Sequence, residues 1–110
     1  MKKKELFLVL ENSEKAITTL AQLRNAGFNA TVMSTESLRH ALDDSPNDHH
    51  FFNLRHLEQR DFQQSTLCLF VVNEDKVESL KTVIRNCTND FKDIKGFMYS
   101  REISDYEGSI

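Results

Sequence analysis

The stretch TLCLFVVNEDKVESLKTVI, residues 66–84, decides the fold of this chain. Residues 66–72 are apolar or β-forming without a break, which is typical of a strand with both faces covered. Asn73 follows as a helix cap, and Glu74 and Asp75 place negative charge in the first turn, where the helix dipole favours it. The apolar residues that then recur at helical spacing are Val77, Leu80, Ile84 and Cys87. The stretch therefore predicts a strand that leads almost directly into an amphipathic helix.

The N-terminal part of the chain has the same order. Residues 5–10 form a short apolar run, after which the pattern turns helical, with Asn12 or Ser13 able to cap and Gly27 supplying a left-handed stop. The apolar face predicted for this helix consists of Ile17, Leu20 and Leu23, with Ala16 and Ala21 beside them. A strand and a helix are therefore predicted here too.

Two further strands complete the pattern. Residues 29–35 are rich in β-formers, and residues 97–103 alternate between apolar and polar side chains. The order strand, helix, strand, strand, helix, strand predicts one α+β domain over residues 1–110, of the ferredoxin-like βαββαβ type. With right-handed crossovers, this fold has a four-stranded antiparallel sheet with two helices on one face and with the first and third strands in the middle.

The two middle strands carry more apolar residues than such a sheet requires. A strand with helices above it and water below it is expected to alternate, yet residues 6–10 and 67–72 are continuously apolar. Outside the segment between the second and third strands, no helix is left to cover the second face. Another copy of the same sheet is the economical cover, so the sequence predicts a symmetric homo-oligomer.

The composition argues against several classes of function. Fourteen Lys and Arg against seventeen Asp and Glu give a net charge of -3, without the cationic surface that nucleic-acid binding needs. The lysines at 2–4 precede an apolar run that is too short for a signal peptide or a membrane span, so a cytoplasmic protein without membrane insertion is expected. In that compartment both cysteines stay reduced, and Cys68 is expected to be a buried, unreactive thiol.

The segment 36–65 is far longer than a hairpin needs, and long connections in compact domains commonly carry function. It holds all four histidines, but no two of them stand four apart, so no metal site is expected. Its apolar residues Phe51, Phe52 and Leu54 are candidates for contact with a protein partner, with packing back onto the domain as the plainer interpretation.

No catalytic pattern is present, and we expect no catalytic residues and no enzymatic activity. With three glycines the chain forms neither a phosphate-binding glycine loop nor a nucleophile elbow. Other functions of the same fold also lack their residues. The strand at 66–72 has no charge and one aromatic residue, unlike an RNA-recognition motif, and the turn at 11–13 lacks the glycine of an ACT-like domain and the arginine of an acylphosphatase.

Several features together resemble the PII (GlnB-like) signalling superfamily. They are the lysine-rich start that runs into the first strand, the long segment after the second strand, and LFVVNEDKVE at 69–78, which is similar to the family's strand followed by an acidic helix start. The resemblance implies a trimer whose sheets face one another, and a T-loop at 36–65 that reaches an unknown protein partner. It also implies clefts between subunits that bind nucleotides or other small effectors.

The chain departs from that family in ways that bear on the ligand. Nucleotide-binding members carry a glycine-rich phosphate loop after the second helix, whereas residues 88–96 contain one glycine, so no nucleotide cofactor is expected. The segment 36–65 has no tyrosine, so the tyrosine uridylylation of enteric members does not apply. Lys95 and Arg101 lie near the family's phosphate-binding cations and are the candidates for an anionic ligand, with ordinary surface charge as the alternative.

These observations predict a non-enzymatic, trimeric regulator that contacts a partner through 36–65 and binds a small anionic effector between subunits. The alternative is an oligomeric interaction module of the same fold that binds no ligand.

Overall fold

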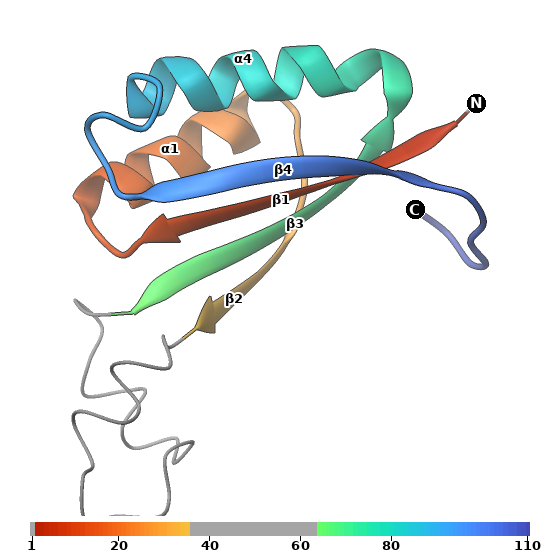
Figure 1. The fold of residues 1–110 in the computed structure, drawn as a ribbon, viewed down its shortest axis with the longest axis horizontal. Helices are drawn as coiled ribbons and strands as arrows, with labels where there is room; N and C mark the ends of the chain where they lie inside the picture. The colour runs from red at the N-terminus through yellow and green to blue at the C-terminus, as the bar shows by residue number, and fades with distance from the viewer. Residues whose placement is uncertain (1, 36–63) are drawn as a thin grey trace, which may run out of the picture.

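The computed structural model describes residues 2–35 and 64–110. Its elements are β1 (Lys3–Glu11), α1 (Glu14–Asn25), β2 (Thr31–Thr35), β3 (Ser65–Asn73), the 3₁₀ turn η2 (Glu74–Lys76), α4 (Val77–Thr88) and β4 (Gly96–Ile103). Figure 1 shows the two helices lying side by side on the sheet. The predicted order of strands and helices is confirmed.

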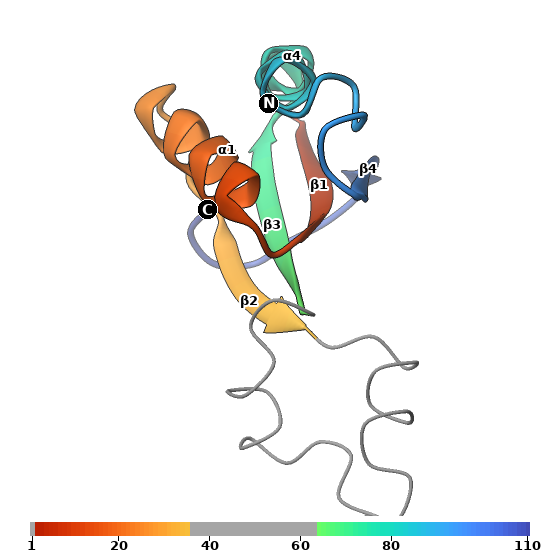
Figure 2. The ribbon, with the colours of Figure 1, turned by 90° about the vertical axis from the view of Figure 1, so that its left-hand side faces the viewer.

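The four strands form one antiparallel sheet in the order β2-β3-β1-β4, with β1 and β3 in the middle as predicted. Both helices cover the same face, and no described helix covers the opposite face, where the C-terminal residues Ser109 and Ile110 lie near Leu69 and Val71 (Figures 1 and 2). The ferredoxin-like α+β fold is therefore confirmed. In the described part of the chain, neither helix has the length and hydropathy needed to cross a membrane.

The core lies between the sheet and the helices. Alternate side chains of β1 and β3 point into it, so that Leu6, Leu8 and Leu10 are fully buried together with Cys68 and Phe70. The helices add Ala16, Leu23, Leu80 and Ile84. Because full burial of one large apolar side chain contributes roughly 1.5–3 kcal/mol, this layer is the main source of stability.

Two of the three predicted helix boundaries follow their expected mechanism. Ser13 caps α1, since its hydroxyl oxygen accepts a hydrogen bond from the Ala16 backbone N–H at 3.2 Å. Gly27 adopts φ +92°, the left-handed conformation expected after a helix. The prediction that the Asn73 side chain caps the second helix is wrong. The strand register places Lys3 opposite Asn73, and Asn73 Oδ1 accepts a hydrogen bond from Lys3 Nζ at 2.5 Å instead.

Each helix differs from its predicted apolar face at one position. Ile17 is 69% exposed, and Thr19 is buried in its place. In α4, Thr88 is buried while Cys87 is only partly so. Both threonines tolerate burial because their hydroxyls donate to a backbone carbonyl one turn earlier, Thr19 to Lys15 at 2.8 Å and Thr88 in the same way.

The strands differ from the predicted ranges by one or two residues at their ends. β1 extends beyond 5–10 because it pairs along its length with both β3 and β4. β2 starts at Thr31 rather than at 29, as an edge strand that pairs only with β3. Since β3 already begins at Ser65, the connection from β2 ends at 64 rather than at 65.

Candidate functional site

The sheet face opposite the helices, which we call the open face, is apolar across all four strands. Its side chains alternate with those of the core, and the strand register sets them beside one another. The apolar residues of the open face are Phe7, Val9, Met33, Leu67, Leu69, Val71, Phe97 and Tyr99. Within one protomer Met33, Tyr99 and Phe97 are 49%, 50% and 53% exposed. A contiguous apolar surface of this kind marks an interaction site.

Aromatic rings form the β4 side of the open face. Tyr99 stacks on Phe7, with ring centroids 5.0 Å apart and an interplanar angle of 28°. Phe97 lies 6.4 Å from Tyr99 and almost parallel to it, at 9°. Stacked rings are rigid, large in area and cost little conformational entropy when a partner covers them. This strip is therefore well suited to contact between proteins.

Arg101 lies at the end of this aromatic strip, on the open face. The Arg101 Nε donates a hydrogen bond to Glu5 Oε1 at 2.8 Å. The side chain that was predicted to bind an anionic ligand is therefore already paired with a carboxylate of the same protomer. The Arg101 side chain is 67% exposed and that of Glu5 14%. The pair therefore has little electrostatic effect on stability in a single protomer, where water screens it.

Lys95 lies just before β4, at the other end of the strand from Arg101. Its carbonyl accepts a hydrogen bond from the Glu11 backbone N–H at 2.9 Å. At strand spacing, the six positions from 95 to 101 span about 20 Å. One protomer does not bring the two candidate cations together, and their role in binding an anion stays a prediction.

The connection between α4 and β4 satisfies its own hydrogen bonds. Asn89, Asp90 and Phe91 have φ of 52°, 54° and 61°, a left-handed run that is rare outside glycine. The backbone N–H groups of Asp90, Lys92 and Asp93 all donate to carbonyls of this same region, and that of Phe91 donates to the Thr88 hydroxyl. These four N–H groups are therefore engaged within the protomer, and two aspartates stand beside them.

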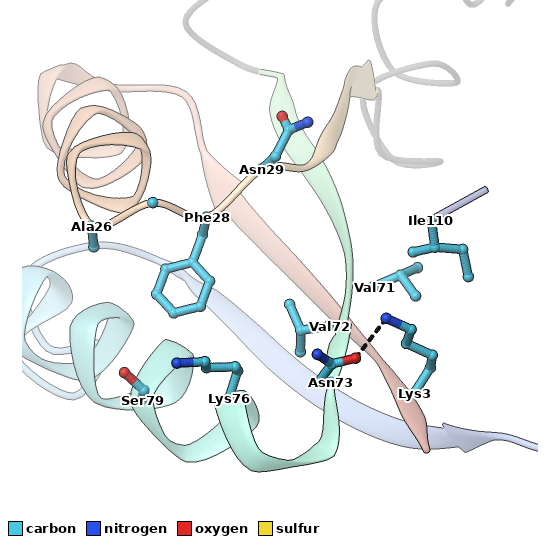
Figure 3. A pocket seen from close by; sticks show the side chains of 11 residues that line it. Lys3, Ala26, Phe28, Asn29, Val71, Val72, Asn73, Lys76, Ser79 and Ile110 are labelled. Atoms are coloured by element: carbon cyan, nitrogen blue, oxygen red, sulfur yellow. Dashed lines mark hydrogen bonds between the residues drawn. The ribbon is translucent and has the colours of Figure 1, made fainter. Parts of the chain in front are cut away.

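A pocket of about 380 Å³ lies where the connection from α1 to β2 meets the end of β3 and the start of α4. Its polar lining includes Lys3, Asn29, Asn73, Lys76 and Ser79 (Figure 3). No sequence pattern predicts this site. Lys3 belongs to the lysine run at the start of the chain and Lys76 to an ordinary helix start, so no local sequence signal links them. The register of β1 and β3 brings them to the same end of the sheet, because it pairs Lys3 with Asn73, three residues before Lys76.

The remaining predicted residues divide into those that are described and those that are not. Cys68 is free and buried, and burial raises the pKa of its thiol from 9.0 to about 11, in keeping with an unreactive side chain. Phe51, Phe52, Leu54 and the four histidines lie outside the described residues. Among the described residues, no three His, Cys, Asp or Glu side chains are grouped as metal ligands.

Comparison with known proteins identifies the fold. No family model matches the sequence, and no curated protein matches it significantly. Three of the similar solved structures are a functionally unknown protein from Pediococcus pentosaceus, PII from Arabidopsis thaliana bound to citrate, and CPII from Thiomonas intermedia, a nitrogen regulatory PII-like protein bound to ADP, AMP and bicarbonate.

The likeness covers nearly the whole chain at low sequence identity. The TM-scores are 0.63, 0.60 and 0.58, and the identities 11%, 15% and 16%, in the order given. The matches cover 99%, 94% and 94% of this chain and 99%, 78% and 89% of the others. The chain therefore has the fold of PII-like proteins, as the resemblance in its sequence implied, in a strongly divergent sequence.

Proposed function

We propose that this protein is a non-catalytic regulator of the PII-like type. Three copies bury their open faces against one another, a small anionic effector binds to the assembly, and the segment 36–65 contacts a protein partner. Catalysis plays no part in this role, since the sequence contains neither a phosphate-binding glycine loop nor a nucleophile elbow.

The observation that carries the proposal is the apolar open face. Both middle strands are covered by helices on one side, yet the other side carries the apolar residues of the open face, with half-exposed Met33, Phe97 and Tyr99 at its borders. A protomer alone would leave this surface in water. A partner of the same kind supplies the matching apolar surface without any further element.

The ligands of the similar structures support an anionic effector. Arabidopsis PII is described as bound to citrate, and CPII as bound to bicarbonate in one structure and to acetate in another. CPII is also described as bound to ADP and AMP. We do not extend nucleotide binding to this chain, because its connection from α4 to β4 uses its backbone N–H groups internally.

The assembly is tested by sedimentation velocity on the wild type and on two lysine variants. The wild type should sediment as a trimer, and Tyr99→Lys should sediment as a monomer, since it places a charge in the middle of the buried strip. Ile17→Lys is the matched control, because Ile17 is also a large exposed apolar residue, 69% exposed against 50% for Tyr99, but lies on the helix side. A monomeric wild type, or equal dissociation of both variants, would refute the proposed assembly.

A ligand screen separates the proposal from the alternative of a ligand-free interaction module. Binding to the native state raises the melting temperature in proportion to the logarithm of ligand concentration. We expect organic acids to raise it and ADP to leave it unchanged. A trimer that no compound stabilises would support the interaction module instead.

A further inference from the structure

The pocket of Figure 3 has a size and a positive charge for which neither the proposed trimer nor Lys95 and Arg101 account. It lies at the end of the sheet where β1 begins, between Phe28 and Asn29 on one side and the start of α4 on the other. At about 380 Å³ it has the size of a site for a small metabolite. None of its described lining residues is an aspartate or a glutamate, whereas two are lysines.

Every polar side chain that lines the pocket carries at least one hydrogen-bond donor. Lys3 is held in place by its bond from Nζ to Asn73 Oδ1. Asn73 therefore turns its amide nitrogen toward the side of the pocket where Lys76 lies (Figure 3). Ser79 adds a hydroxyl beside Lys76. Two ammonium groups, one amide nitrogen and one hydroxyl match the roughly four lone-pair positions of a single carboxylate.

The other wall of the pocket is apolar and firmly placed. Phe28 and Val72 line the pocket and also pack against the core, so their positions are fixed by the fold. Ala26 lies beside Phe28 on this wall, whereas Val71 and Ile110 line the pocket on the other side of β3, next to Lys3 (Figure 3). An inorganic anion would leave these side chains in water, whereas an aliphatic group attached to the anion would cover them.

We infer that this pocket binds a small organic acid, with its carboxylate between Lys3, Asn73 and Lys76 and its aliphatic body against Phe28 and Val72. Binding requires only residues of one protomer. The inference deepens the proposed function by naming the residues and the chemical class of the effector, and it rests on that proposal only for the regulatory consequence.

The test is a titration of the ¹⁵N-labelled full-length protein, followed by amide shifts in NMR spectra at constant ionic strength. Three probes separate the two halves of the ligand: hexanoate carries charge and aliphatic body, inorganic phosphate carries charge alone, and hexan-1-ol carries the body alone. Hexanoate should give saturable shifts that cluster at the amides of Gly27, Phe28, Asn73 and Ser79. Hexan-1-ol should bind at least about tenfold more weakly because it forms no charged hydrogen bond, and phosphate should bind at least about tenfold more weakly because it covers no apolar surface.

Charge-removing variants locate the carboxylate. Lys76→Met should weaken hexanoate binding about tenfold or more without disturbing α4, since the Lys76 side chain makes no capping bond. Lys3→Met should act in the same direction. The matched controls are Lys4→Met, next to Lys3 in β1, and Lys81→Met, further along α4; neither residue lines the pocket. Both controls should bind hexanoate like the wild type.

Several results would overturn the inference. They are shifts scattered over all surface lysines, equal losses in the control variants, or phosphate binding as tightly as hexanoate. Sedimentation velocity on the same samples distinguishes failure of the pocket from failure of the proposed assembly. A trimer that does not bind hexanoate overturns only the pocket, and a monomer that binds it through Lys76 overturns only the assembly.

Discussion

Gly96, the first residue of β4, is the glycine at which one added methyl group should do the most damage. A Cβ at Gly96 would lie 2.2 Å from the carbonyl oxygen of Val9, 3.0 Å from Leu10 Cδ2 and 3.2 Å from Leu10 Cα. Gly96 pairs with Leu10 in the sheet, and the adjacent Lys95 carbonyl accepts the Glu11 N–H. The nearest obstacle is backbone, so Gly96→Ala must push β4 away from the central strand by about 1 Å.

The expected cost combines overpacking with a weakened strand pair. Overpacking costs about 1–3 kcal/mol and one lost hydrogen bond about 1 kcal/mol, so Gly96→Ala should lower the free energy of unfolding by about 3 kcal/mol. For a domain of this size, that corresponds to a fall in melting temperature of roughly 10–20 °C.

Gly27→Ala is the matched control for this measurement. Gly27 has φ +92°, but a Cβ there would have no heavy atom within 4 Å. Its cost is therefore conformational alone, about 1 kcal/mol. Urea unfolding followed by circular dichroism, at one fixed protomer concentration, measures both variants. If Gly96→Ala unfolds at the same urea concentration as Gly27→Ala, the reasoning from the close approach of β4 to β1 is wrong.

Three further predictions concern other parts of the fold. Burial raises the pKa of the Cys68 thiol to about 11, so the folded protein holds this proton more tightly than the unfolded chain does. The associated stability, at most about 2–3 kcal/mol, is complete below the unfolded pKa of 9.0 and lost as the pH rises to about 11. Urea unfolding at pH 8 and pH 11 should show a smaller alkaline loss in Cys68→Ala than in the wild type; equal losses would contradict it. Asp90 has φ 54°, so Asp90→Gly should be more stable than Asp90→Ala by about 1 kcal/mol, and the reverse order would show that the backbone there is unstrained. Ser13→Ala should cost about 1 kcal/mol of unfolding free energy and Ser13→Asp much less, because only the aspartate can replace the capping bond to Ala16; equal costs would show that the bond is unimportant.

The fold could be predicted because its signals are local. Continuous apolar runs marked the two middle strands, and Ser13 and Gly27 marked the ends of α1 through interactions within a few residues. The side of α1 that faces the sheet could not be predicted as well. Hydrophobicity favours burial of Ile17, but the way the helix docks on the sheet turns Thr19 inward, where the Lys15 carbonyl satisfies its hydroxyl.

The candidate site was only partly predictable, because it depends on residues that are far apart in the sequence. The apolar open face follows from the lack of alternation in β1 and β3. The pocket of Figure 3 does not, since it requires knowing that Lys3 lies opposite Asn73, 70 positions later. Asn73 looks like a helix cap in the sequence, and only the strand register shows that its side chain is used by Lys3 instead.

The central place of β1 has a consequence for how the chain is made. β1 ends at Glu11, but its two neighbours in the sheet, β3 and β4, begin only at Ser65 and Gly96. β2, although it leaves the ribosome early, pairs with β3 and gives β1 no support. The sheet therefore cannot close until Gly96 and the residues after it have been made, and its widely separated pairings favour slower folding than that of a helical bundle, whose contacts are local.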